Sequence, residues 1–174
     1  IVEAVEGDAQ VQVVRAETAK LSASGNLILE ESQLGTTSDL SLLAQDTVRV
    51  RDSVTNPFIA QAGGKLLVQG DQGIDIFALN HPGSGFASGG DMVLRSANTV
   101  GGDAHYWSGG SFRIENLDGN LGDLYSPYDP IIRSQGDVSF NSYIGNSLHI
   151  LAGGRVDISD FIVFTGKEAG EDGI

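Results

Sequence analysis

The sequence contains no cysteine among its 174 residues. That absence excludes disulfide bonds, thiolate metal sites and a cysteine nucleophile, and it leaves the cellular compartment open. Basic residues are scarce, because 10 Lys and Arg stand against 23 Asp and Glu and give a net charge of −13. Phosphate backbones are bound by clustered Lys and Arg, so this balance argues against nucleic acid as a partner. No apolar run approaches the roughly 18 residues that a membrane-spanning helix needs.

Glycine, in contrast, is abundant. The chain has 24 glycines, about twice the usual share of roughly 7%, and they follow no three-residue collagen period. With 40% hydrophobic residues the chain is expected to fold, and its length suits one domain with a sizeable core. It begins at Ile1 without Met or a signal peptide and stops at Ile174 without a recognisable end. We therefore expect residues 1–174 to be a single segment of a larger protein.

One short pattern recurs along the chain: a turn-forming residue, then two positions later an apolar residue, any residue and a second apolar residue. The apolar pairs are Leu27/Leu29, Leu40/Leu42, Val48/Val50, Leu66/Val68, Ile74/Ile76, Met92/Leu94, Phe112/Ile114, Val138/Phe140, Leu148/Ile150 and Val156/Ile158. Glycine lies two residues before the first apolar position in six of these ten pairs, and the central residue is polar in seven. Such alternation places one side of a strand in a core and the other in water.

The spacing of these pairs separates a solenoid from a β-sandwich. Leu40, Leu66 and Met92 follow one another at 26-residue intervals, and Val48 and Ile74 repeat that interval. Stacked coils require such regularity. The step from one strand to the next is eight residues, as from Leu40 to Val48, which leaves no room for a crossover helix. The sequence therefore predicts an all-β fold, a right-handed parallel β-helix of roughly seven coils with irregular corner loops.

Two segments fit this pattern less well. Residues 1–25 are expected to form a first coil or a cap, with strand favoured over an amphipathic helix at residues 15–23. Residues 116–130 contain Pro127, Pro130 and several turn formers, so they are predicted to be a loop insertion without regular strand.

One apolar run follows the last clear strand. Phe161-Ile162-Val163-Phe164 is too apolar to be left in water. An open end of a solenoid exposes unpaired strand edges, which repeat proteins cover with caps. We therefore expect this run to bury against the last coil or to mediate end-to-end, homo-oligomeric association.

The best candidate for a binding site is His105-Tyr106-Trp107, which contains the only tryptophan. An exposed aromatic side chain beside a β-face can act as a platform for sugar rings, so these three residues are candidate carbohydrate contacts. The alternative, which we favour, is that Tyr106 or Trp107 fills an end or a corner of the solenoid.

Catalytic patterns are weak. Glycoside cleavage needs two carboxylates about 5 to 10 Å apart with aromatic side chains beside them. Asp75 and Asp157 are expected to face outward on coils far apart, whereas Asp91 and Asp137 follow corner glycines. These four residues form no compact pair in the sequence, so we expect no catalytic residues and no enzyme.

Metal and phosphate patterns are equally weak. Asn116–Asp123 has closely spaced oxygen donors, but it lacks the order and the terminal Glu of an EF-hand, so we favour a solvated loop. His81, His105 and His149 have no metal-ligand spacing. The glycine-rich runs 63–65 and 70–73 lack the spacing of phosphate-binding loops and a following helix. We therefore expect no cofactor and no metal.

Longer phrases of the sequence resemble a known family. They are Asp52–Gly64, Gln69–Ile76, Ala78–Pro82, Ser88–Asp91, Gly102–His105, Ser108–Phe112 and Tyr128–Ile132, within roughly residues 25 to 160. In these phrases the chain resembles cyanobacterial filamentous haemagglutinin-like proteins, which are exported by two-partner secretion. The family has no catalytic residues to carry over, and the Asn-Pro-Asn turn of its amino-terminal secretion domain is absent, because Asn56-Pro57-Phe58 differs from it.

The resemblance implies an internal β-helix segment of a large secreted exoprotein. Such a protein would cross the outer membrane through a dedicated partner pore and would serve at the cell surface, in adhesion or as structure, with surface glycans or protein receptors as partners. We expect a non-catalytic rod that mediates surface attachment or extracellular matrix assembly. The alternative is a carbohydrate-binding or polysaccharide-degrading β-helix protein, which a groove with paired carboxylates and flanking aromatics would reveal.

Overall fold

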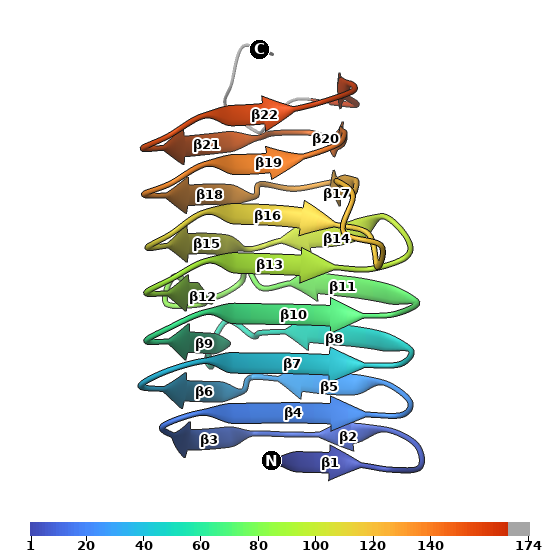
Figure 1. The fold of residues 1–174 in the computed structure, drawn as a ribbon, viewed down its shortest axis with the longest axis vertical. Helices are drawn as coiled ribbons and strands as arrows, with labels where there is room; N and C mark the ends of the chain where they lie inside the picture. Colours follow the sequence, from blue (N-terminus) through green and yellow to red (C-terminus); the bar gives the residue numbers. More distant parts are fainter. Residues whose placement is uncertain (167–174) are drawn as a thin grey trace.

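A computed structural model describes residues 1–166, and the segment that leads to Ile174 lies outside this range. The described chain forms strands and loops only and winds into a right-handed parallel β-helix, in which each coil rises above the one before it (Figure 1). Three parallel sheets, here called A, B and C, run along the stack. Seven complete coils give one strand to every sheet, and an eighth gives strands to A and B. The predicted fold class is confirmed.

The strands of each sheet are as follows. Sheet A consists of β1 (Val2–Ala4), β4 (Ala19–Ala23), β7 (Leu40–Ala44), β10 (Leu66–Gly70), β13 (Met92–Arg95), β16 (Phe112–Glu115), β19 (Val138–Phe140) and β22 (Val156–Ile158). Sheet B consists of β2 (Ala9–Gln10), β5 (Leu27–Glu30), β8 (Thr47–Arg51), β11 (Gly73–Phe77), β14 (Val100–Asp103), β17 (Leu124–Ser126), β20 (Tyr143–Gly145) and β23 (Ile162–Phe164). Sheet C consists of β3 (Val13–Ala16), β6 (Gln33–Thr36), β9 (Ile59–Ala62), β12 (Gly85–Ser88), β15 (His105–Ser108), β18 (Ile131–Ser134) and β21 (His149–Ala152).

The register of sheet A matches the predicted repeat. Leu40, Leu66 and Met92 are Cα partners on successive strands, and the row continues to Phe112 and Val138. All five side chains are buried. Because side chains alternate across a strand, the residue that follows each of them faces outward. Inward apolar residues therefore stack from coil to coil and form one continuous core.

Only the pair Leu148/Ile150 of the predicted repeat falls at sheet C, where Ile150 lies on β21 and Leu148 directly precedes it. The other strands of sheet C are missing from the repeat, because in most of them only one of the two inward positions is large and apolar. Phe86 and Ile132 occupy this position, and each is followed two residues later by an inward serine, Ser88 or Ser134. The serine hydroxyls turn back onto the corner that leads into sheet A. Ser88 Oγ donates to the Gly90 carbonyl at 2.8 Å, and Ser134 Oγ donates to the Gly110 carbonyl at 2.7 Å. A small hydroxyl residue thus satisfies the backbone where the chain bends.

The corner between sheets C and A also stacks backbone on backbone. The Gly90 N–H donates to the Gly64 carbonyl at 2.9 Å, and the next coil repeats this bond with the Gly110 N–H. A Cβ on Gly89 would lie 2.1 Å from the Gly63 carbonyl oxygen, so this close approach requires glycine.

Loops, rather than strands, set the length of each coil. The interval from Val138 to Val156 is 18 residues, whereas the interval from Leu40 to Leu66 is 26. The longer coils carry seven-residue loops between sheets B and C, at residues 52–58 in the third coil and 78–84 in the fourth. Each of the two 26-residue intervals from Leu40 to Leu66 and from Leu66 to Met92 therefore contains one of these equally long insertions.

Residues 116–130 are not one strandless loop, and that prediction is wrong in part. β17 lies inside the segment, where Leu124 pairs with Val100 and continues the buried row of sheet B. The inward Leu124 and Ser126 supply the apolar and small side chains that the core needs, and Pro127 lies just beyond the strand. In the segment 1–25, strands β1 to β4 form and no helix is present, so the favoured strand interpretation is confirmed.

The predicted burial of Phe161–Phe164 is partly realised. β23 pairs with β20, and the Phe164 ring lies 6.0 Å from the Tyr143 ring, yet its side chain is half exposed. End-to-end association remains a prediction.

Candidate functional site

The predicted carbohydrate contacts lie on β15 in the fifth coil, and the strand separates them. His105 and Trp107 face outward from sheet C, and Trp107 is 45% exposed. Tyr106 points into the core and is only 2% exposed, so its assignment as a ligand contact is wrong. Alternation along the strand is the reason, because consecutive side chains cannot share one face. Two of the three predicted residues therefore remain candidates.

Tyr106 instead belongs to an aromatic column inside the helix. Its ring stacks on Phe86 with centroids 5.4 Å apart, and Phe112 lies on its other side at 5.2 Å. The hydroxyl has no hydrogen-bond partner within residues 1–166 and lies near the position of Gly102, where an added Cβ would approach it to 3.0 Å. Burial raises the pKa of Tyr106 far above its ordinary value, with a further contribution from the Asp103 charge. Packing, rather than recognition, accounts for this residue.

Trp107 borders a shallow depression of about 230 Å³ on the outer face of sheet C. Gly85 and Ala87 on β12 line the depression, and both are smaller than their register partners on β9 and β15. Trp107 lies directly beside Ala87 in the register, and Arg133 is its partner on the other side. Gln61, the partner of Ala87 on β9, closes the opposite end. An indole, a guanidinium and an amide thus surround a depression that can accept a flat ring.

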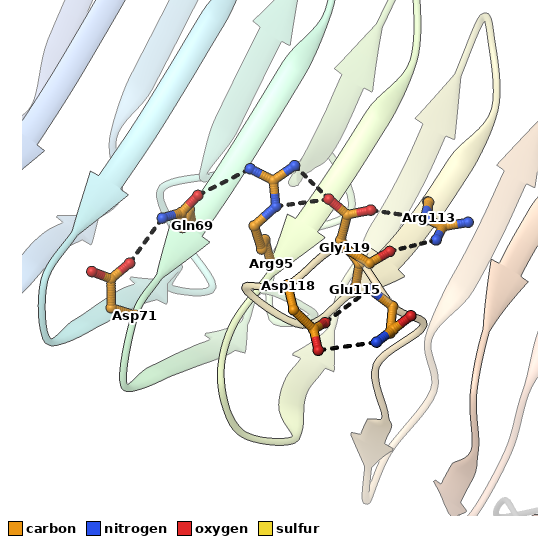
Figure 2. Close-up of polar contacts among 8 residues, drawn as sticks. Gln69, Asp71, Arg95, Arg113, Glu115, Asp118 and Gly119 are labelled. Atoms are coloured by element: carbon orange, nitrogen blue, oxygen red, sulfur yellow. Dashed lines mark hydrogen bonds and ion pairs between the residues drawn. The ribbon is translucent and has the colours of Figure 1, made fainter.

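A second polar cluster lies on the outer face of sheet A. Figure 2 shows a chain of contacts from Asp71 through Gln69, Arg95 and Glu115 to Arg113. Glu115 is only 7% exposed, and its two carboxylate oxygens accept from different arginines, with Arg95 Nε and Arg113 Nε each at 2.7 Å. Glu115 forms ion pairs with both arginines, whereas Asp71 accepts from the neutral Gln69 amide at 2.8 Å.

This cluster anchors the loop that was considered for calcium. Arg113 donates to the Gly119 carbonyl at 2.8 Å, and the Asp118 carboxylate accepts from the backbone and side chain of Asn120 at 2.9 and 3.0 Å (Figure 2). Asp123 points elsewhere and accepts from Asn141 and Ser142. Within residues 1–166 no three His, Asp or Glu side chains converge as metal ligands would.

The four aspartates considered for catalysis lie on different parts of the surface. Asp75 lies on sheet B and pairs with Arg51 at 2.8 Å, whereas Asp157 lies on β22 of sheet A. Asp91 and Asp137 lie on the corner between sheets C and A, separated by an intervening coil. Each accepts a backbone N–H of the next coil at 2.8 Å, Asp91 from Ser111 and Asp137 from Arg155. These carboxylates complete the corner backbone.

Two other carboxylates, Asp103 at the end of β14 and Asp52 directly after β8, are buried and have opposite pKa shifts. Asp103 is desolvated by burial, which raises its pKa despite bonds from Ser126 and the Tyr128 N–H. Asp52 is also desolvated, but bonds from Ser84, His81 and Asn80 outweigh that cost and lower its pKa. Each carboxylate ties a corner loop to the coil below it.

The histidines are as scattered as the sequence indicated. His81 lies in the loop 78–84 and accepts the Gly83 N–H at its Nδ1, 2.9 Å away. His149 lies on the seventh coil, and its Nε2 is 3.2 Å from Asp129. His105 borders the Trp107 depression.

Sequence reasoning missed Gln61, Ala87 and Arg133 as neighbours of Trp107. The usable signal was the pattern of sheet C. An inward apolar residue and an inward small residue lie six and four positions before the strands of sheet A from β7 onward, as Phe86 and Ser88 lie before Met92. The residue between those two inward positions faces outward. Reading that residue from each coil would have aligned Gln61, Ala87, Trp107 and Arg133.

Within residues 1–166 no helix is long and apolar enough to cross a membrane. No known protein family matches the chain, and no curated protein or solved structure matches it.

Proposed function

We propose that the chain is a non-catalytic, structural and adhesive segment of a large secreted cell-surface protein. In this proposal the stacked coils form part of a rod that serves surface attachment or matrix assembly. The parent chain is exported across the outer membrane through a partner pore, as the resemblance to filamentous haemagglutinin-like proteins implies.

The observation that carries the proposal is the exposure of core positions at both ends of the described stack. Val2 occupies the inward row that continues through Leu21, yet it is 48% exposed, against 1% for Leu21. Val156 continues the row of Val138 and is 50% exposed, against 0% for Val138. Their register is that of the core, and they are exposed because no described coil covers them. A further coil would bury them and pair the open strand edges.

The placement of the carboxylates supports a non-catalytic role. Hydrolysis of a glycosidic bond uses two carboxyl groups that face the same substrate. Asp75 on sheet B pairs with Arg51. Asp91 and Asp137 accept backbone N–H groups at the corner between sheets C and A. The depression at Trp107, where a sugar could lie, has no carboxylate among its described lining residues.

A depolymerisation assay tests the proposal against the polysaccharide-degrading alternative. The chain at micromolar concentration is incubated with a panel of neutral, uronate-containing and sulfated polysaccharides. New reducing ends and unsaturated products are then measured over many hours. We expect no release above a heat-denatured control. Release that increases with protein concentration, and that disappears in an Asp91→Asn or Asp137→Asn variant, would overturn the non-catalytic assignment.

A further inference from the structure

The outer face of sheet C carries no acidic residue in the seven coils that the structure describes, although the whole chain has a net charge of −13. Its ionisable outward residues are Arg15, His105, Arg133 and His149. The other outward positions hold apolar, amide or glycine residues. The two other sheets differ, since sheet A presents Glu3 and Asp157 outward, and sheet B presents Glu30 and Asp75.

The cations of this face keep their charge available. Arg133 makes no ion pair with a carboxylate within residues 1–166, and Arg15 bonds only to the backbone carbonyls of Val14 and Gln33, at 3.1 and 3.3 Å. His149 is the exception, because Asp129 from the neighbouring loop lies 3.2 Å from its Nε2. Two guanidinium groups, about 24 Å apart along the stack at the usual strand spacing, therefore have no carboxylate partner within residues 1–166.

The shape of the face suits an extended ligand. Three shallow depressions follow one another along it. The first lies over Gly35 beside Arg15, the second over Ala87 beside Trp107, and the third lies beyond Arg133. Parallel in-register stacking accounts for the first two, because Gly35 and Ala87 are small outward residues between larger ones on neighbouring coils. Such a row of hollows fits a linear polymer better than a compact ligand.

We propose that this face binds a linear acidic polysaccharide along the axis of the stack. A pyranose ring lies over Ala87 against the Trp107 indole, and an anionic group, carboxylate or sulfate, pairs with Arg133. The indole supplies apolar contact to the ring, and Arg133 supplies the charge-assisted hydrogen bonds. Repeated anionic groups along the polymer can reach Arg15 as well. This inference deepens the adhesive part of the proposed function and rests on it.

Binding of defined polymers to the full chain tests the inference. Polygalacturonate and dextran sulfate are the two anionic probes, dextran is the neutral one, and polyglutamate represents an acidic protein. Titration calorimetry at low and raised salt gives the affinities. We expect an anionic polysaccharide to bind, dextran to bind at least about tenfold more weakly, and raised salt to weaken binding. A preference between the two anionic probes identifies carboxylate or sulfate as the anionic group.

Matched variants locate the site. Trp107→Ala and Arg133→Gln should each weaken binding about tenfold or more. The controls lie on sheet B: Tyr125→Ala removes an aromatic ring of similar exposure, 46%, and Arg49→Gln removes an exposed arginine. Both controls should bind like the unmodified chain. Ala87→Leu keeps the indole and fills the depression, and it should also weaken binding; denaturant midpoints verify that each variant is folded.

Three results would overturn the inference. The first is equal affinity for dextran and the anionic polysaccharides. The second is equal affinity for polyglutamate and the anionic polysaccharides, with binding unchanged in Trp107→Ala. The third is no binding by any probe. None of these results affects the proposal of a rod, which depends on the terminal coils. Conversely, cleavage of polygalacturonate would contradict the non-catalytic assignment and leave the binding face in place.

Discussion

Replacing Leu66 with Asp tests the inward register of sheet A in the middle of the stack. Leu66 is 1% exposed and lies between Leu40 and Met92 in the core. Removing most of a buried leucine costs about 2–5 kcal/mol. A carboxylate without a partner in that space adds several kcal/mol or is protonated at a similar cost. The sum is comparable to the whole stability of an ordinary domain, about 5–15 kcal/mol, so we expect the variant to be unfolded or barely folded.

Leu67→Asp is the matched control, because it makes the same chemical change one residue later on the opposite side of β10. Leu67 lies outward between Ser41 and Val93 and is partly exposed. We expect a loss of about 1 kcal/mol for Leu67→Asp, and about half a kcal/mol for Arg49→Ser on the outer face of sheet B. Urea unfolding, followed by far-ultraviolet circular dichroism, gives the midpoints. Equal losses at Leu66 and Leu67, or a larger loss at Leu67, would refute the register and the alternation with it.

Three further changes have definite expected outcomes. Tyr106→Phe removes a buried hydroxyl that lacks a partner in the described structure, so thermal unfolding should show unchanged or higher stability, by up to about 1–3 kcal/mol; a clear loss would show that the hydroxyl is bonded. Gly89→Ala brings a Cβ against a backbone carbonyl, whereas Gly90→Ala meets atoms only at 3.4 Å and beyond, so the urea midpoint should fall for the first and hardly change for the second. Asp103→Asn should stabilise the fold at pH 7, because burial raises the pKa of Asp103 and its charged form opposes folding. That advantage should shrink as the pH falls toward about 4, since the native carboxyl then takes up its proton before the unfolded one does; an advantage independent of pH would contradict this explanation.

The sequence predicted sheets A and B because their coils repeat large apolar residues with one outward residue between them. Leu40, Leu66 and Met92 align in the structure as their spacing indicates. The 26-residue interval does not measure the length of a basic coil. It recurs between Leu40, Leu66 and Met92 because the loops 52–58 and 78–84 have the same length in two neighbouring coils. The sixth coil, from Phe112 to Val138, also spans 26 residues but has its extra residues elsewhere, and the 18-residue coil from Val138 to Val156 still stacks. Strand register is set by inward side chains, whereas coil length is set by corners on the surface.

The candidate site could be predicted only in part. Trp107 was identifiable as the single tryptophan in the sequence, but the period-two alternation that excludes Tyr106 from the surface was not applied to that strand. Arg133 and Ala87 lie 26 and 20 residues away from Trp107, and they become its neighbours only through stacking of coils of unequal length. Such neighbours require the register of sheet C, whose inward serines and alanines give a weak hydrophobic signal.

Sedimentation velocity over a range of concentrations most directly tests the claim that the stack continues at its open ends. We expect the chain to associate as its concentration rises, because inward side chains such as Phe164 are half exposed on the last described coil. Phe164→Lys should reduce this association, since a lysine at that inward position prevents a further coil from packing on it. Val163→Lys, which changes the outward neighbour on β23, should leave association unchanged. A chain that stays monomeric at every concentration, or two variants with equal effects, would contradict the account.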